Sequence, residues 1–187
     1  MRSPKLLNRD ETILFIIDPQ GSLMEMVKNT KKIIHAHNKI IRIAQILGVP
    51  IVVSEHYPNG LGHILPEIVE TLGNDYQPIE KVIFSAWGES KIRQAIESHN
   101  RKTLLITGIE THICILQTVT EAIAAGYDVH VMMDGVSARG RIEHKMALEM
   151  FKLLGAGLTT WESVAYQWMR TSEAPEFKQI LEVIKDN

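Results

Sequence analysis

The sequence predicts an α/β fold with three layers: a six-stranded, mostly parallel sheet of Rossmann-like type with helices on both faces. Short apolar runs rich in β-branched residues alternate with longer stretches whose apolar residues recur at helical spacing. This alternation is typical of right-handed βαβ units, which produce parallel sheets covered by helices. At 187 residues the chain is long enough for one well-filled core, so we expect a single domain over residues 1–187.

Six apolar runs supply the expected strands, in chain order residues 12–17, 51–53, 81–84, 103–108, 127–133 and 158–160. Asp18 follows the first run, and Gly108 stops the fourth where the backbone must turn. Because ligand sites in parallel sheets form at the carboxyl ends of strands, Asp18 and the segment after Gly108 are expected to share one crevice.

The expected helices, after a polar leader at residues 1–10, cover residues 30–47, 67–72, 89–99, 111–125, 141–154, 162–170 and 175–185. Gly48 and Gly126 follow two of these patterns where the C′ residue of a helix is usually glycine. The methionines of the 141–154 pattern are interpreted as core residues. No GxGxxG or P-loop pattern follows the first strand, which argues against a dinucleotide-binding phosphate cradle.

Charge and hydropathy exclude several classes of function. Lysine and arginine number 20 against 22 acidic residues, so a formal charge of −2 gives no basic surplus for a nucleic acid or an anionic membrane. The apolar stretch at residues 13–17 is too short to span a bilayer, and no cleavable signal precedes it. A single cysteine precludes an internal disulfide, and we expect a cytoplasmic protein.

Cys114 is the candidate nucleophile. Thr111 is a plausible N-cap, which places Cys114 in or beside the first turn of a helix that follows a buried strand. The helix dipole and its free N–H groups favour a thiolate, which is the nucleophilic form. A lone cysteine after an apolar strand is also typical of a small buried core residue, so this position alone leaves both interpretations open.

The loop after the second strand is the candidate metal site. It holds residue types found among metal ligands, namely Glu55, His56 and His63, together with Tyr57. Their spacing matches no zinc signature, so we expect that this loop does not bind a metal ion.

Four motif blocks in order carry a family resemblance: Asp18-Pro19-Gln20; Lys81 with Phe84-Ser85-Ala86; Gly108-Ile109-Glu110-Thr111-His112-Ile113-Cys114; and Gly126-Tyr127-Asp128-Val129 with Asp134. With these blocks the chain resembles the isochorismatase-like cysteine hydrolases over nearly its whole length. Within that family the chain most resembles the subgroup of YcaC-like hydrolases and eukaryotic isochorismatase-domain proteins, and its C-terminal segment is similar to theirs too. The resemblance implies a hydrolase that cleaves an amide-type C–N bond of a small molecule and needs no cofactor.

The resemblance implies a catalytic triad of Asp18, Lys81 and Cys114. Cys114 would attack a carbonyl carbon and form a thioester. Asp18 would take the thiol proton and later activate water, and Lys81 would hold Asp18 ionised and orient it. Seen alone, Asp18 before proline is also a common turn former, and Lys81 at a strand edge is commonly just solvated.

The family pattern further implies a cis peptide bond between Ile109 and Glu110 and an oxyanion hole made of the backbone amides of Glu110 and Cys114. The expected substrate pocket is lined by Glu55, Tyr57, Phe84, Trp87 and Ile109. The metal-binding nicotinamidases of the family carry an Asp-x-His element where this chain has Glu55 and Tyr57. That departure favours metal-independent chemistry, while His56 and His63 keep a metal site open.

We expect a homo-oligomer, a dimer or larger, in which the later helices and the C-terminal segment take part. Aromatic residues and methionine crowd the segment after the sixth strand, namely Trp161, Tyr166, Trp168 and Met169. These side chains would alternatively cover one end of the sheet within the monomer. A different function also stays open, an oligomeric interaction module that keeps the hydrolase fold and has little turnover.

Overall fold

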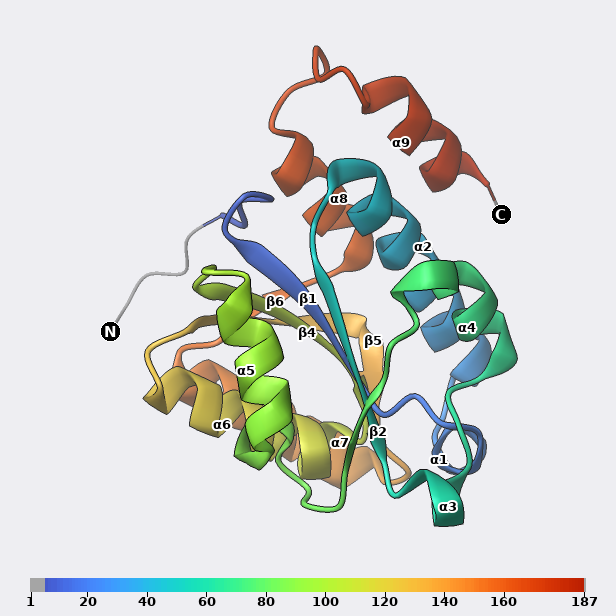
Figure 1. Ribbon diagram of the computed structural model, residues 1–187, viewed down its shortest axis with the longest axis vertical. Helices are drawn as coiled ribbons and strands as arrows, with labels where there is room; N and C mark the ends of the chain where they lie inside the picture. Colours follow the sequence, from blue (N-terminus) through green and yellow to red (C-terminus); the bar gives the residue numbers. More distant parts are fainter. Residues whose placement is uncertain (1–5, 187) are drawn as a thin grey trace.

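The computed structural model describes residues 6–186, which excludes the first half of the expected polar leader. Six parallel strands form one sheet in the order β3-β2-β1-β4-β5-β6 (Figure 1). The strands are β1 (Thr12–Ile17), β2 (Ile51–His56), β3 (Ile79–Lys81), β4 (Thr103–Ile109), β5 (Asp128–Ser137) and β6 (Gly157–Thr159). The predicted α/β class is confirmed, and the sheet is entirely rather than mostly parallel.

Nine α-helices surround this sheet in the described part of the chain. They are α1 (Gly21–Met26), α2 (Thr30–Leu47), α3 (Pro58–Leu61), α4 (Pro66–Leu72), α5 (Ser90–Ser98), α6 (Leu116–Ala124), α7 (Arg141–Leu154), α8 (Trp161–Met169) and α9 (Phe177–Lys185). Short 3₁₀ turns cover Gly73–Asp75 and Ala86–Gly88, and a π-helical turn covers Thr111–Ile115. The short helices α1 and α3 were not predicted from the sequence.

Alternating residues of each buried strand supply two separate cores. In β1, Leu14 and Ile16 pack with α2, α4, α8 and α9, whereas Ile13 and Phe15 pack on the other face with α5, α6 and α7. Successive side chains of a strand point to opposite faces, so a strand buried on both faces reads as a continuous apolar run. Figure 1 shows the two helical layers on either side of the sheet.

Two expectations, one about a strand and one about the oligomer interface, are wrong. Lys81 is the last residue of β3 rather than the first, because the strand covers Ile79–Lys81 and residues 82–84 form an exposed loop. Trp168 and Met169 are buried in the monomer core, so they are not free to form the oligomer interface suggested for them.

Gly108 lets β1 and β4 approach closely at the carboxyl end of the sheet. Its φ of +131° suits glycine, and a Cβ there would lie 1.9 Å from the carbonyl oxygen of Ile17. The registered pair of Ile17 and Gly108 therefore brings the residues that follow each strand into one place. Those residues include Asp18 and the turn that carries Cys114.

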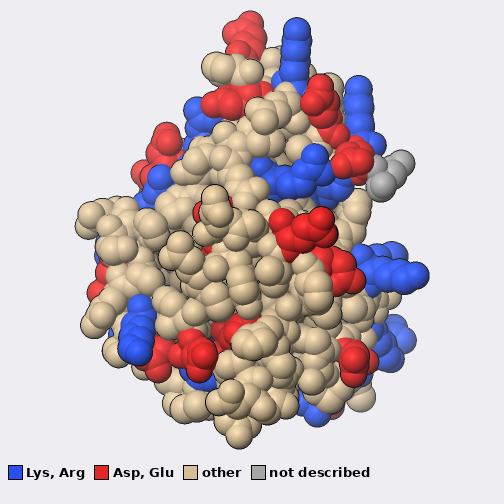
Figure 2. Space-filling model, turned by 45° about the vertical axis from the view of Figure 1, so that its right-hand side comes forward, with Lys and Arg blue, Asp and Glu red and all other residues tan. Residues whose placement is uncertain are grey.

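The surface carries charges of both signs. Figure 2 shows acidic and basic side chains interspersed among uncharged residues on the face it displays, with no extended region of one sign. Among residues 6–186, no helix has both the length and the apolar character needed to cross a membrane.

Candidate active site

Asp18, Lys81 and Cys114 meet at the carboxyl end of the sheet. The Lys81 ammonium lies between the other two, with Nζ 2.6 Å from Asp18 Oδ2 and 3.6 Å from Cys114 Sγ. Strand order explains the convergence. The strands β2 and β3 lie on one side of β1 and the strands β4, β5 and β6 on the other, and a crevice forms at the carboxyl ends of the strands where the order reverses. All three residues are buried, Cys114 being 4% exposed.

Asp18 is held by the neighbouring strand β2. Ser54 Oγ donates a hydrogen bond of 2.7 Å to Asp18 Oδ1, and the Asp18 N–H donates to the Ser54 carbonyl over 3.1 Å. The backbone of Asp18 is left-handed, with a φ of +53°. These contacts aim one carboxylate oxygen at Ser54 and the other at Lys81.

Lys81 is held by the loop that follows it. Its Nζ donates to the carbonyl oxygens of Ile83 and Phe84 over 3.3 and 3.1 Å, and it lies 3.4 Å from His56 Nδ1. Burial and the charge of Lys81 lower the pKa of His56, so a neutral imidazole borders the ammonium. The lysine is therefore a buried positioning group rather than a solvated residue at a strand edge.

The structure contradicts the expectation that Cys114 is poised to ionise. Burial first, and then the negative charge of Asp18, raise the pKa of the Cys114 thiol from 9.0 to about 12, although the charge of Lys81 opposes them. Loss of solvation thus outweighs the helix dipole on which the expectation rested. At neutral pH this shift favours the protonated thiol over the thiolate.

The turn that carries Cys114 differs from the predicted N-cap arrangement. Glu110 occupies the N-cap position and Thr111 lies inside the π-helical turn, where its Oγ1 is 2.9 Å from His144 Nδ1. The peptide bond between Ile109 and Glu110 is cis, which confirms that expectation. Arg139 holds the Glu110 carboxylate through several hydrogen bonds, the shortest 2.6 Å.

The hydrogen bonds from Arg139 also favour the ionised form of the Glu110 carboxylate. Burial opposes ionisation, but the hydrogen bonds and the charge of Arg139 hold the pKa of Glu110 below its ordinary value. The anchored Glu110 side chain fixes the start of the turn that carries Cys114.

Three of the five residues expected to line the substrate pocket have their side chains engaged elsewhere. Ile109 is fully buried in a small cluster with Met24 and Ile33. Trp87 packs edge-to-face on Tyr127, with ring centroids 4.8 Å apart. Both side chains therefore contribute to the cores rather than to an open pocket.

Glu55, the third of these residues, belongs to a buried hydrogen-bond network. Its carboxylate accepts bonds from the Ile64 N–H at 3.0 Å and the Tyr76 hydroxyl at 2.7 Å, and lies 3.0 Å from His63 Nδ1. His56 faces Lys81 instead, and within residues 6–186 no three His, Cys, Asp or Glu side chains are grouped to hold a metal ion. Glu55 thus ties the loop after β2 to the rest of the fold.

Tyr57 and Phe84 are the two expected lining residues that remain accessible. Both are about half exposed, and the Phe84 ring lies against that of His56 with centroids 5.5 Å apart. Tyr57 also lines a hollow of about 340 Å³ whose wall includes Lys81 and Glu89. The Lys81 side chain itself is fully buried, so this hollow borders the residue without exposing its ammonium.

The sequence interpretation missed Ser54, and it considered His56 only as a candidate metal ligand rather than as a neighbour of Lys81. Both belong to β2, which was expected to end at residue 53 and instead continues to His56. Ser54 is fully buried although polar, and a hydroxyl inside an apolar strand was the available signal. The side chain that it contacts is not readable from the sequence.

Comparisons with known proteins find matches over most of the chain. A family model described as the Isochorismatase domain matches residues 12–163. Isochorismatase family protein 1A of Dictyostelium discoideum is 32% identical over 184 residues, which cover 97% of this chain and 89% of that protein.

Solved structures extend the comparison. A MAR1 ribonuclease from Caenorhabditis elegans matches with a TM-score of 0.89 at 32% identity, over 95% of this chain and 91% of that one. The YcaC gene product of Escherichia coli, described as an octameric hydrolase of unknown specificity, matches with a TM-score of 0.86 at 20% identity, over 98% of each chain. The second likeness shows that the fold is shared.

Proposed function

The chain belongs to the isochorismatase family of hydrolases, and we propose that it is a cysteine-dependent hydrolase that cleaves an amide-type C–N bond of a small molecule. One observation carries the proposal: a buried lysine contacts both a carboxylate and the only thiol of the chain, at 2.6 and 3.6 Å. Burying a charge pair costs desolvation free energy, and apolar residues of the same size would pack without that cost. The position of this pair beside a thiol therefore supports a catalytic role.

The first half-reaction would form a thioester. Asp18 would take the Cys114 proton as Sγ attacks the carbonyl carbon, because the raised thiol pKa leaves almost no thiolate at neutral pH. Lys81 would stabilise the negative charge that passes from the carboxylate to the sulfur. The oxyanion would be met by the backbone amides of Glu110 and Cys114, and the protonated Asp18 would then give its proton to the leaving amine.

The second half-reaction would hydrolyse the thioester. Asp18, again ionised, would take a proton from water as the water oxygen attacks the thioester carbon. Cleavage of the C–S bond would release a carboxylic acid and return the proton to the Cys114 sulfur. The exposed rings of Tyr57 and Phe84 would border the entry to this site.

RNA hydrolysis is a second candidate, because the similar protein from Caenorhabditis elegans is named a ribonuclease. The charge of this chain weighs against it, since a formal charge of −2 offers little attraction for a phosphate backbone. A buried thiol and carboxylate also suit attack on a carbonyl carbon better than transfer of a phosphoryl group.

We also propose that the protein is a homo-oligomer. The support is an exposed apolar stripe along α7, formed by Ile142, Met146, Met150 and Leu153. The interpretation of these two methionines as core residues is therefore wrong. The loop after β3 adds exposed apolar side chains at residues 82–84. These surfaces replace the buried Trp168 and Met169 as the candidate interface.

The test of function is a screen of small carboxamides that measures release of ammonia or amine, with homopolymer RNA as a parallel substrate. Wild-type protein is expected to hydrolyse at least one amide, with and without chelator, and Cys114→Ala is expected to lose that activity. RNA cleavage that survives in Cys114→Ala, with no amide hydrolysed by the wild type, would contradict the proposal. A chelator that abolishes amide hydrolysis would overturn its metal-independent form.

A further inference from the structure

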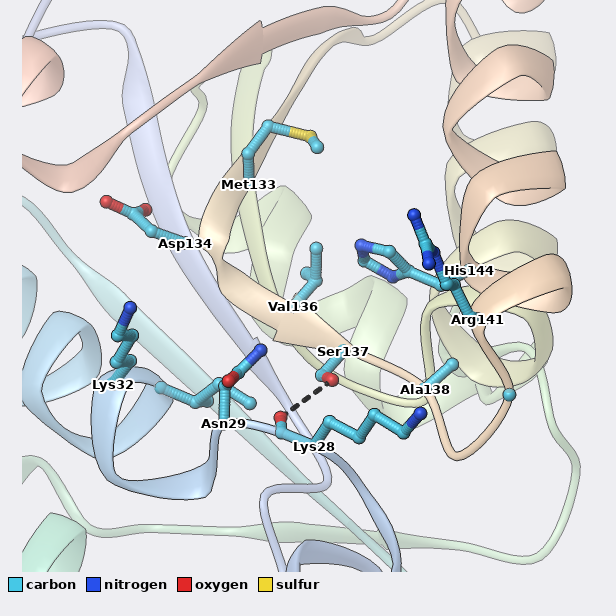
Figure 3. A pocket seen from close by; sticks show the side chains of 12 residues that line it. Lys28, Asn29, Lys32, Met133, Asp134, Val136, Ser137, Ala138, Arg141 and His144 are labelled. Carbon is cyan, nitrogen blue, oxygen red and sulfur yellow. Dashed lines mark hydrogen bonds between the residues drawn. The ribbon is translucent and has the colours of Figure 1, made fainter.

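A pocket of about 370 Å³ lies where the end of β5 faces the starts of α2 and α7 (Figure 3). Asp18, Lys81 and Cys114 are not among its lining residues. It is therefore a different cavity from the hollow beside the triad lysine.

Three cationic side chains border this pocket, those of Lys28, Lys32 and Arg141. Each is exposed at the surface, and none forms an ion pair with another side chain of residues 6–186. In Figure 3, Lys28 and Arg141 lie toward the α7 end of the pocket and Lys32 lies at the α2 end. Positive charge therefore faces the cavity from more than one side.

The acidic groups nearby do not cancel this charge. Asp134 is the only carboxylate among the lining residues, and both of its oxygens accept a hydrogen bond from the Trp161 N–H at 3.2 Å. Glu143 is not a lining residue, but its carboxylate lies against Gly140, which lines the pocket at the start of α7. Three cations against these two carboxylates, one of them engaged with Trp161, leave the pocket net positive.

Two long helices begin at the pocket and add to its positive potential. Asn29 and Gly140 occupy the N-cap positions of α2 and α7, and neither helix has a side-chain hydrogen bond that caps its first turn. The N-terminus of a helix carries partial positive charge and N–H donors. The α2 terminus has no acidic residue in its first turn and therefore reinforces the lysines, whereas Glu143 offsets part of this effect at the start of α7.

The rest of the wall is apolar. Ile33 and Val136 are buried and line the cavity together with Met133. A ligand that fits this combination has a compact anionic group and a short hydrocarbon or aromatic body. Because a phosphate monoester is largely dianionic at neutral pH, it matches three cations better than a monocarboxylate does.

We propose that this pocket binds a small organic phosphate monoester, with its phosphate toward Lys28 and Arg141 and its apolar body against Ile33 and Val136. The pocket also touches the catalytic turn, because His144 lines it and lies 2.9 Å from the Thr111 hydroxyl. A bound phosphate would therefore lie one side chain away from the turn that carries Cys114.

Calorimetric titration with phenyl phosphate at low ionic strength tests the site. Wild-type protein is expected to bind one equivalent of phenyl phosphate saturably. Phenol, which lacks the phosphate, is expected not to bind. The double variant Lys28→Gln/Arg141→Gln is expected to bind at least about tenfold more weakly, because it removes two of the three cations that face the phosphate. Lys91→Gln, which removes an exposed charge from α5, and Cys114→Ser are expected to bind like the wild type.

The thermal unfolding midpoints of all variants are compared first, so that a loss of binding can be distinguished from a loss of folding. Saturable binding that is equally tight in the double variant would overturn the proposal. Loss of binding in Cys114→Ser would also overturn it, because the ligand would then occupy the catalytic crevice. No saturable heat with wild-type protein would mean that the pocket takes no such ligand.

Discussion

The ammonium of Lys81 lies 2.6 Å from Asp18 Oδ2, and neither side chain is exposed to solvent. A buried pair of this kind gains little net stability over apolar residues of the same size, because both charges lose their hydration. Removing one partner is far more costly, since the other charge is left buried without compensation. Because Lys81 also contacts Cys114, the pair couples the stability of the fold to the chemistry of the site.

A double-mutant cycle on this pair measures that coupling. Lys81→Met is expected to lower the free energy of unfolding by about 3–5 kcal/mol, because it leaves the Asp18 carboxylate buried and unpaired. Adding Asp18→Asn to Lys81→Met is expected to recover part of this loss, as read by urea unfolding. Lys91→Met, at an exposed position in α5, serves as the control and is expected to change little. Additive effects of the two site substitutions would show that the charges do not interact.

The raised thiol pKa predicts slow alkylation of Cys114. Iodoacetamide is expected to react more slowly with the folded protein at pH 7 than with the urea-unfolded chain. Between pH 7 and 10 the rate for folded protein is expected to rise about tenfold per pH unit without levelling, because a pKa of about 12 lies above this range. A plateau near neutral pH would instead indicate a thiolate stabilised in the resting state.

The raised pKa of Cys114 also makes the stability of the fold depend on pH. Because the folded thiol has a higher pKa than the unfolded one, folding favours the protonated form. This contribution is complete below about pH 9.0, the ordinary value that the unfolded chain takes, and is lost as pH rises toward about 12. The proposed reaction starts from the protonated thiol, so slow alkylation of Cys114 is compatible with catalysis. The alkylation rate at neutral pH therefore does not distinguish an enzyme from an interaction module.

Ser54 is expected to position the general base. Ser54→Ala removes the 2.7 Å hydrogen bond to Asp18 Oδ1 and is expected to slow acyl transfer from p-nitrophenyl acetate by about tenfold or more. Ser54→Thr keeps a hydroxyl and is expected to restore most of the rate. Ser98→Ala, on an exposed face of α5, is the matched control. Equal rates in all four proteins would show that Asp18 needs no orientation by β2.

The apolar stripe of α7 predicts self-association. Ile142 and Leu153 are 74% and 79% exposed, so light scattering of the wild type is expected to give a multiple of 21.1 kDa. Ile142→Lys/Leu153→Lys is expected to lower that mass, whereas Lys145→Gln on the same helix is not. A wild-type mass near 21.1 kDa would contradict the proposed oligomer.

Much of the fold was predictable because local patterns determine it. The strand runs are apolar on both faces, as β1 is, and Gly48 and Gly155 follow helices where the backbone turns left-handed. Lys81 was misplaced within its strand because the apolar residues after it, such as Val82, lie in an exposed loop. Periodicity cannot separate a short apolar loop from a short strand.

The site was predictable in its residues but not in its electrostatics. The ordered motif blocks named Asp18, Lys81 and Cys114, and these three lie together. The pKa of Cys114 depends on how much protein surrounds the sulfur, a tertiary property that no local pattern reports. For the same reason Glu55 and Ile109 were expected to face the substrate, although long-range packing buries both.

Mapping of the acyl group during turnover tests the central claim most directly. Wild-type protein is mixed with p-nitrophenyl acetate, quenched in acid within the first turnovers, digested and analysed by mass spectrometry. The account predicts one acetyl group per chain on the peptide that contains Cys114, none in Cys114→Ala, and much slower labelling in Asp18→Asn. Turnover with no acyl group on Cys114, or an undiminished rate in Cys114→Ala, would contradict it.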